Sequence, residues 1–156
     1  MFERILFPTD GSEAALSAAD QLAACLKGSA MSRVTVLVVT APTDPDLSDF
    51  SPDLVERRNA GLRRRAQRAL DATAARLARQ GVAYTTRILE GDPVSKSIAE
   101  EARHGYDLIA IGSRGMGMSE EDQHYLGSVA ERVIRRTTLP ILVIPSIPRT
   151  ESGPVQ

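Results

Sequence analysis

The stretch Tyr106-Asp107-Leu108-Ile109-Ala110-Ile111-Gly112-Ser113-Arg114-Gly115 joins a buried-strand pattern to a glycine-rich turn, and Gly127-Ser128 follows after the eleven residues 116–126. The segment that Ser128 opens has the apolar spacing of a helix. Glycines between a strand and a helix let backbone N–H groups approach an anion, and the helix N-terminus adds unpaired donors and partial positive charge. An ordinary surface loop is the alternative, since glycine is common in loops. Two glycine clusters around one strand-loop-helix unit favour an anion site.

The composition is that of a soluble, single-domain protein. The chain has 156 residues, 42% of them hydrophobic and 25% charged, and a formal net charge of -1. Such a balance gives no bulk electrostatic reason to expect a nucleic-acid or anionic-membrane partner. The single cysteine, Cys25, excludes an internal disulfide and fits a reducing cytoplasm. We expect Cys25 to be a small core residue on the apolar face of a helix.

Strand patterns alternate with helical patterns along the whole chain. The expected strands cover 5–7, 34–39, 82–89, 108–111 and 139–144. The expected helices begin at Ser12, at Ser51-Pro52, at Pro93 and at Ser128. Ser12 and Ser51 are capping residues, and Pro93 is expected as the first helical residue. This alternation predicts an α/β fold, a parallel sheet with helices on both faces.

The carboxyl ends of such strands are where ligands bind, at the point where the strand order reverses. Thr9-Asp10 ends the first strand, Val39 ends the second, and Ile111-Gly112 ends the fourth. All three segments are therefore expected to face one crevice. Asp10 also suits a turn ahead of a helix, which is the ordinary interpretation of an aspartate there.

Several of these segments together resemble the universal stress protein family over nearly the full chain. The matching segments are 5–13, 90–93, 107–115, 126–131 and 139–145. The resemblance implies a three-layer αβα fold with a five-stranded parallel sheet of order 3-2-1-4-5, of the adenine-nucleotide α-hydrolase-like type. It also implies a homodimer through the last strand, Ile141 to Ile144, and pairing there would protect an apolar edge.

The resemblance further implies a nucleotide site. Asp10 matches an acidic residue near the adenosine, Val39 an adenine contact, and Ile111 with Gly112 the backbone at the ribose. Gly115, Gly127, Ser128 and Val129 match a phosphate cradle, and Arg114 lies where it could reach the nucleotide. With the end of the first strand, the expected site comprises Pro8, Thr9, Asp10, Val39, Ile111, Gly112, Arg114, Gly115, Gly127, Ser128 and Val129.

The loop between the glycine clusters departs from the family pattern. ATP-binding members have G-x2-G-x9-G-[ST], whereas eleven residues separate Gly115 from Gly127 here. The longer loop carries Glu120, Glu121 and Asp122. These carboxylates could repel a triphosphate, point to solvent, or help hold Mg²⁺ through water.

Other features carry less chemistry. The arginines at 57, 58, 63, 64, 65 and 68 form a basic helical face, which we interpret as solvated surface, with a site for a partner as the alternative. His124, in the longer loop, is expected to be exposed. The chain has no paired metal-ligand motif, no Walker loop and no nucleophile elbow, so we expect no catalytic residues and at most slow ATP hydrolysis.

The sequence thus predicts a cytoplasmic stress-response protein that binds ATP with Mg²⁺, or AMP or cyclic AMP, and whose occupancy changes its contacts with an unidentified protein partner. The alternative is a dimeric interaction module that works without nucleotide through the acidic loop 116–126. The domain is expected over 1–148, followed by a disordered tail over 149–156.

Overall fold

The computed structural model describes residues 2–42, 51–115 and 126–145 of the chain. Its strands are β1 (Arg4–Pro8), β2 (Arg33–Thr40), β3 (Ala83–Glu90), β4 (Leu108–Gly112) and β5 (Ile141–Ile144). Its helices are α1 (Glu13–Leu26), α3 (Pro52–Arg79), α4 (Val94–Ala102) and α5 (Ser128–Arg136). The strands form one parallel sheet of order β3-β2-β1-β4-β5, which confirms the predicted fold.

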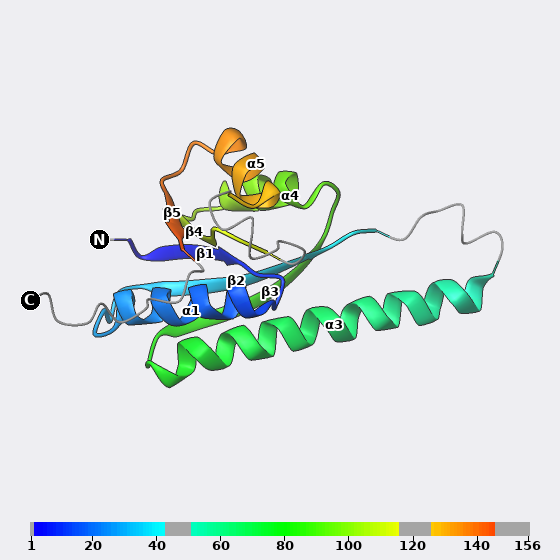
Figure 1. Ribbon diagram of the computed structural model, residues 1–156, viewed down its shortest axis with the longest axis horizontal. Coiled ribbons are helices and arrows are strands. Elements are labelled where there is room, and N and C mark those ends of the chain that lie inside the picture. Colours follow the sequence, from blue (N-terminus) through cyan, green and yellow to red (C-terminus); the bar gives the residue numbers. More distant parts are fainter. Residues whose placement is uncertain (1, 43–50, 116–125, 146–156) are drawn as a thin grey trace, which may run out of the picture.

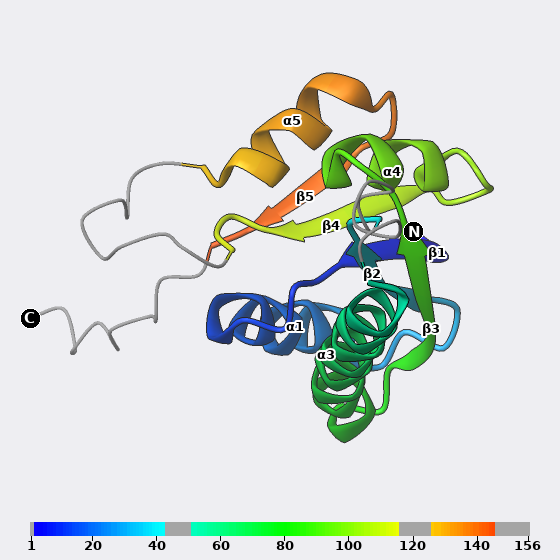
Figure 2. The same cartoon turned by 90° about the vertical axis from the view of Figure 1, so that its right-hand side faces the viewer.

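The helices lie in two layers on either side of the sheet. Helices α1 and α3 cover one face, and α4 and α5 cover the other (Figures 1 and 2). α3 is the longest helix and its N-terminal half runs past the sheet (Figure 1). Consecutive crossovers therefore place α1 and α3 together and leave α4 and α5 for the opposite face, as right-handed connections require when the strand order reverses.

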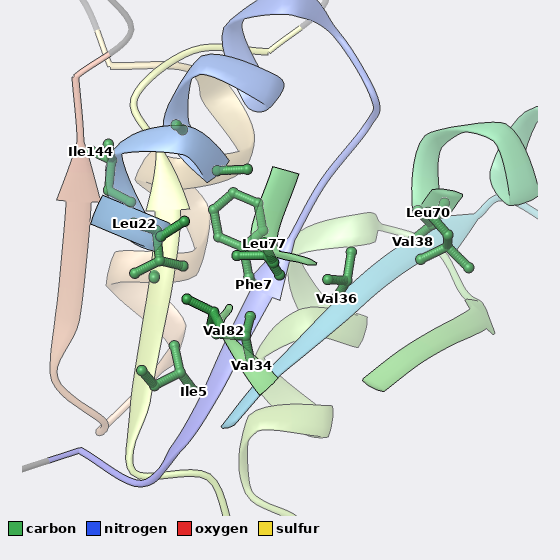
Figure 3. Packing of buried hydrophobic residues seen from close by; sticks show 14 of the residues in the cluster. Ile5, Phe7, Leu22, Val34, Val36, Val38, Leu70, Leu77, Val82 and Ile144 are labelled. Carbon is green, nitrogen blue, oxygen red and sulfur yellow. The ribbon is translucent and has the colours of Figure 1, made fainter. Parts of the chain in front are cut away.

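The central strands β1, β2 and β4 each contribute side chains to two hydrophobic cores, one on either face of the sheet. Ile5 and Phe7 of β1 point toward α1 and α3, where they pack with Leu22 and Leu77 (Figure 3). Leu6, between them in sequence, belongs to the core under α4 and α5. A strand buried on both faces has a continuous apolar run, which is why the strands are recognisable without polar alternation. Burying a side chain such as Phe7 contributes about 1.5–3 kcal/mol.

Helix starts differ in how they are capped. Ser12 caps α1 as predicted, because its Oγ accepts a hydrogen bond of 3.2 Å from the Ala15 N–H. Ser51 precedes α3 with Pro52 in the first turn, but its side chain makes no cap hydrogen bond. Pro93 is the N-cap of α4 and not its first helical residue, so the expected start of that helix was one residue early.

Two further expectations change. Cys25 is exposed and not a core residue, because the buried face of α1 runs through Leu22 and on to the partly buried Leu26. The last strand begins at Ile141 and not at Leu139, although the Pro140 carbonyl already accepts a 3.0 Å bond from the Ile109 N–H. The expected tail, 149–156, lies outside the described residues. Among the residues that the structure describes, no helix is long and apolar enough to cross a membrane.

Candidate functional site

A cleft of about 360 Å³ opens at the carboxyl ends of the strands. Its walls come from the ends of β1, β2 and β4, from α3 and α4, and from the first turn of α5. The structure brings all of the predicted site residues to this one cleft: Pro8, Thr9, Asp10, Val39, Ile111, Gly112, Arg114, Gly115, Gly127, Ser128 and Val129. Segments far apart in sequence therefore converge as the parallel topology requires.

The turn after β1 is held by its own side chains. The Thr9 N–H donates to the Leu37 carbonyl at 2.8 Å, which extends the pairing of β1 with β2. The Thr9 Oγ1 accepts from the Gly11 N–H at 3.2 Å and lies 3.1 Å from the Thr73 Oγ1 of α3. The Asp10 Oδ1 accepts from the Ser12 N–H at 2.9 Å. Asp10 is therefore a turn residue, as its ordinary interpretation predicted, and at the same time lines the cleft.

Gly115 lies against the side chain of Asp10 in the lining of the cleft. A Cβ at Gly115 would lie 2.9 Å from the Asp10 Oδ2, closer than side chains normally approach. Glycine thus leaves the second carboxylate oxygen of Asp10 room at this point. Both Asp10 and Gly115 line the cleft, so any larger residue at 115 would fill space between them.

Hydrogen bonds fix both ends of the glycine-rich loop. The Ser113 N–H donates to the Ile144 carbonyl at 2.8 Å, and the Gly127 N–H donates to the Ser113 carbonyl at 2.7 Å. Gly127 is the N-cap of α5. The first helical bond of α5 runs from the Glu131 N–H to the Gly127 carbonyl at 3.0 Å. The amides of residues 128–130 precede this bond, so they have no intrahelical acceptor and can serve a ligand.

The cleft has an apolar wall and a polar end. Its apolar lining comes from β2, β4, α3 and α4 and includes Leu37, Val39, Val94, Ile98 and Ile111. The polar end has the backbone of the glycine-rich loop and the first turn of α5. In the described lining the charged side chains are Asp10, Arg65 and Arg114, which sum to one positive charge. This arrangement suits a ligand with a flat apolar part and an anionic part.

Comparison with known proteins identifies the family. The model of the universal stress protein family matches residues 1–145. The chain belongs to the universal stress protein family. The universal stress protein Sll1654 of Synechocystis sp. is 33% identical over 147 residues, which cover 93% of this chain and 87% of Sll1654. The family assignment predicted from the sequence motifs is therefore confirmed.

Solved structures agree with the fold. The structure of protein MJ0577 superposes with a TM-score of 0.72 at 29% identity, covering 92% of this chain and 96% of MJ0577. A universal stress protein in complex with cAMP has a TM-score of 0.62 at 22% identity, covering 94% of this chain and 98% of that one. The second likeness shows a shared fold, in a protein that binds an adenine nucleotide.

The motifs of this universal stress protein did not indicate the contribution of α3. Leu62, Arg65, Ala66 and Ala69 line the cleft from this helix. Arg65 was expected on a solvated basic face, and although its side chain is exposed, it lies at the cleft. Helical spacing in the sequence could have indicated this position. Arg65 precedes Ala69 of the apolar stripe by four residues, so both lie on the same side of the helix.

Some predicted features lie outside the described residues. These are the acidic residues Glu120, Glu121 and Asp122, together with His124. Within residues 2–42, 51–115 and 126–145, no cluster of three or more His, Cys, Asp or Glu side chains could hold a metal ion.

Proposed function

We propose that this universal stress protein binds an adenine nucleotide, with ATP as the first candidate, in the cleft at the carboxyl ends of the strands. The observation that carries the proposal is the convergence of separate segments on one cleft of about 360 Å³ with an apolar wall and an amide-rich end. A nucleotide has the same division, an apolar base at one end and phosphates at the other.

Each part of the nucleotide has a counterpart in the cleft. The apolar wall around Val39 would receive the adenine. The Asp10 carboxylate lines the cleft and would accept hydrogen bonds from the ribose hydroxyls, while its Oδ1 also accepts one from the Ser12 N–H. The backbone at Gly115 and the first turn of α5 would receive the phosphates, because unpaired amides at a helix N-terminus favour anions.

Magnesium enters this proposal with the nucleotide. Because no described cluster of acidic or histidine side chains could hold the ion by itself, Mg²⁺ would be bound mainly by the phosphates of ATP. Arg114, which lines the cleft beside Gly115, adds a fixed positive charge for the phosphates. AMP and cyclic AMP remain candidates for the same site, and the cAMP complex of a protein with this fold supports an adenine nucleotide over other ligands.

Binding, and not catalysis, is the proposed role. Asp10 is the carboxylate in the described lining of the cleft, and one of its two oxygens already serves the turn after β1. Nucleotide occupancy would instead act by changing the surface around the cleft, which a cytoplasmic protein partner could recognise.

A homodimer through β5 completes the proposal. β5 is an edge strand of the sheet, paired with β4 along one side. Leu142 in its middle is 39% exposed. Pairing with the same strand of a second copy would satisfy the edge and cover this side chain.

Thermal unfolding with and without nucleotide tests the proposed function. A ligand at about a hundred times its Kd stabilises the folded state by about 2.7 kcal/mol. For a domain of this size the midpoint should rise by roughly 5–11 °C with Mg-ATP, and much less with Mg-GTP. AMP and cyclic AMP in parallel rank the adenine nucleotides. No shift with any of them at millimolar concentration would contradict the proposal and favour the nucleotide-independent interaction module.

A further inference from the structure

Arg65 is placed differently from the other arginines of α3. It lines the cleft together with Leu62 and Ala66, whereas Arg64 and Arg68 are exposed residues that do not line it. The basic face of α3 is therefore not uniform. Arg65 is exposed and lines the candidate nucleotide site, which the first turn of α5 also lines.

The position of Arg65 along α3 is fixed by contacts one and two turns away. Gly11 approaches α3 so closely that a Cβ there would lie 2.6 Å from the Ala69 Cβ. The Thr73 Oγ1 lies 3.1 Å from the Thr9 Oγ1 and donates to the Ala69 carbonyl at 2.8 Å. Residues four apart share one side of a helix, so Arg65, Ala69 and Thr73 all lie on the side that meets the turn after β1. α3 can neither rotate nor slide there without losing these contacts.

The charge of Arg65 matters because of its neighbours in the cleft. Without it, the described lining would hold Asp10 and Arg114, whose charges cancel. With it, the charged side chains of the described lining sum to one positive charge. A guanidinium carries a positive charge and has five N–H donors, so in the lining of a cleft it attracts anionic oxygens.

We infer that Arg65 is a specificity-determining residue of this site, which favours nucleotides with several phosphates over uncharged adenosine. This inference rests on the proposed function, since it assigns Arg65 a role toward the same ligand. The guanidinium acts on the negative charge of the phosphate chain from α3, while the amides of α5 act from the first turn of that helix. Its contribution should therefore grow with the number of phosphates.

Isothermal titration calorimetry of the full chain with Mg-ATP and with adenosine tests the inference. Arg65→Gln should weaken ATP binding by about tenfold, the effect of one charge-assisted contact, and change adenosine binding by less than about twofold. Arg65→Lys keeps the charge and should retain most of the ATP affinity. Arg68→Gln removes the same charge from an exposed position outside the cleft, so it should leave both affinities unchanged.

Each other result has a definite meaning. An equal loss for ATP and adenosine, a Lys variant as weak as the Gln variant, an equal effect of Arg68→Gln, or no effect at Arg65 would overturn the inference while ATP binding by the unsubstituted protein stands. If the unsubstituted protein binds neither ligand, the proposed function fails, and the inference fails with it. Unfolding midpoints of the variants without ligand confirm that exposed substitutions on α3 leave the fold intact.

Discussion

The amino ends of the five parallel strands lie together along one edge of the sheet, the amino edge, and their carboxyl ends lie along the opposite one, the carboxyl edge. The segments at these two edges are connected in different ways. At the amino edge, side chains bind the backbone of neighbouring segments. The Asp107 carboxylate accepts from the Glu3 N–H at 2.9 Å and from the Arg4 N–H at 3.2 Å, and the Ser32 Oγ donates to the Phe2 carbonyl at 2.7 Å. These bonds tie the chain before β1 to the starts of β2 and β4.

At the carboxyl edge, residues without side chains line a cleft. Gly112, Gly115 and Gly127 belong to this lining, although backbone bonds such as that from the Thr9 N–H to the Leu37 carbonyl also connect segments there. Both edges belong to the same strands, so the difference comes from the residues at the strand ends and not from the topology. From this difference we expect the free energy of unfolding to depend mainly on residues at the amino edge, and ligand affinity mainly on residues at the carboxyl edge. Substitutions at each edge test whether the two properties are separate.

Gly11→Ala should show the largest exception to this expectation. Gly11 lies at the carboxyl edge, and yet we expect it to affect the stability of the fold. Its φ is +73°, and a Cβ would lie 2.6 Å from the Ala69 Cβ. We expect a loss of about 3 kcal/mol in the free energy of unfolding, from the left-handed backbone and from overpacking together. Denaturant titration measures it.

Gly28→Ala is the matched control for Gly11. Gly28 precedes β2 at the amino edge, with a φ of +84°, and a Cβ added there would have no other atom within 4 Å. Gly28→Ala should lower the free energy of unfolding by about 1–2 kcal/mol, the effect of a left-handed backbone at alanine without any steric contact. Equal losses at both glycines would show that the contact of Gly11 with α3 is easily relieved.

Gly115→Val should separate binding from stability. The Cβ would lie 2.9 Å from the Asp10 Oδ2, inside the cleft, while the backbone of Gly115 is not in the left-handed region. We expect ATP affinity to fall by about a hundredfold, equivalent to about 2.7 kcal/mol, with the unfolding midpoint of the free protein little changed. Calorimetry and thermal unfolding measure the two effects.

Gly61→Val is the control for this substitution. Gly61 lies in α3, and a Cβ there would meet only the Arg64 guanidinium at 3.9 Å. Its ATP affinity should equal that of the unsubstituted protein. Unchanged affinity in Gly115→Val would remove the glycine-rich loop from the proposed site.

Asp107→Ala should do the reverse of Gly115→Val. Loss of a carboxylate that accepts hydrogen bonds from two backbone N–H groups at a partly buried position should cost about 1–2 kcal/mol of stability. The rise in unfolding midpoint caused by Mg-ATP should remain, because Asp107 lies at the opposite edge from the cleft. Asp107→Asn keeps one acceptor oxygen and should cost less. A nucleotide effect that disappears in Asp107→Ala would show that the two edges are coupled.

The strand ends explain how much of this molecule was predictable. Thr9-Asp10, Val39 and Ile111-Gly112 are located by strand patterns alone, and parallel pairing then forces them to one edge. Helical spacing from Ala69 indicates which side of α3 carries Arg65. It does not show which part of α3 meets the strand ends, because that depends on how Ala69 packs against Gly11. Cys25 was misplaced for a similar reason, since its exposure depends on which flank of the last turn of α1 meets the sheet.

The smallest predicted effect concerns Ser12 and Ser51, which both precede helices. Ser12 makes a side-chain-to-backbone bond of the kind that dominates the amino edge, although it lies at the carboxyl edge. Ser12→Ala should cost about 1 kcal/mol of unfolding free energy, the usual value for a lost N-cap. Ser51→Ala should change stability by less than about 0.5 kcal/mol, because no cap bond is lost there. Urea titrations of the two variants against the unsubstituted protein measure the difference. Equal costs would mean that serine stabilises these helix starts through its backbone preference, and the bond seen at Ser12 would then contribute nothing to the stability of the carboxyl edge.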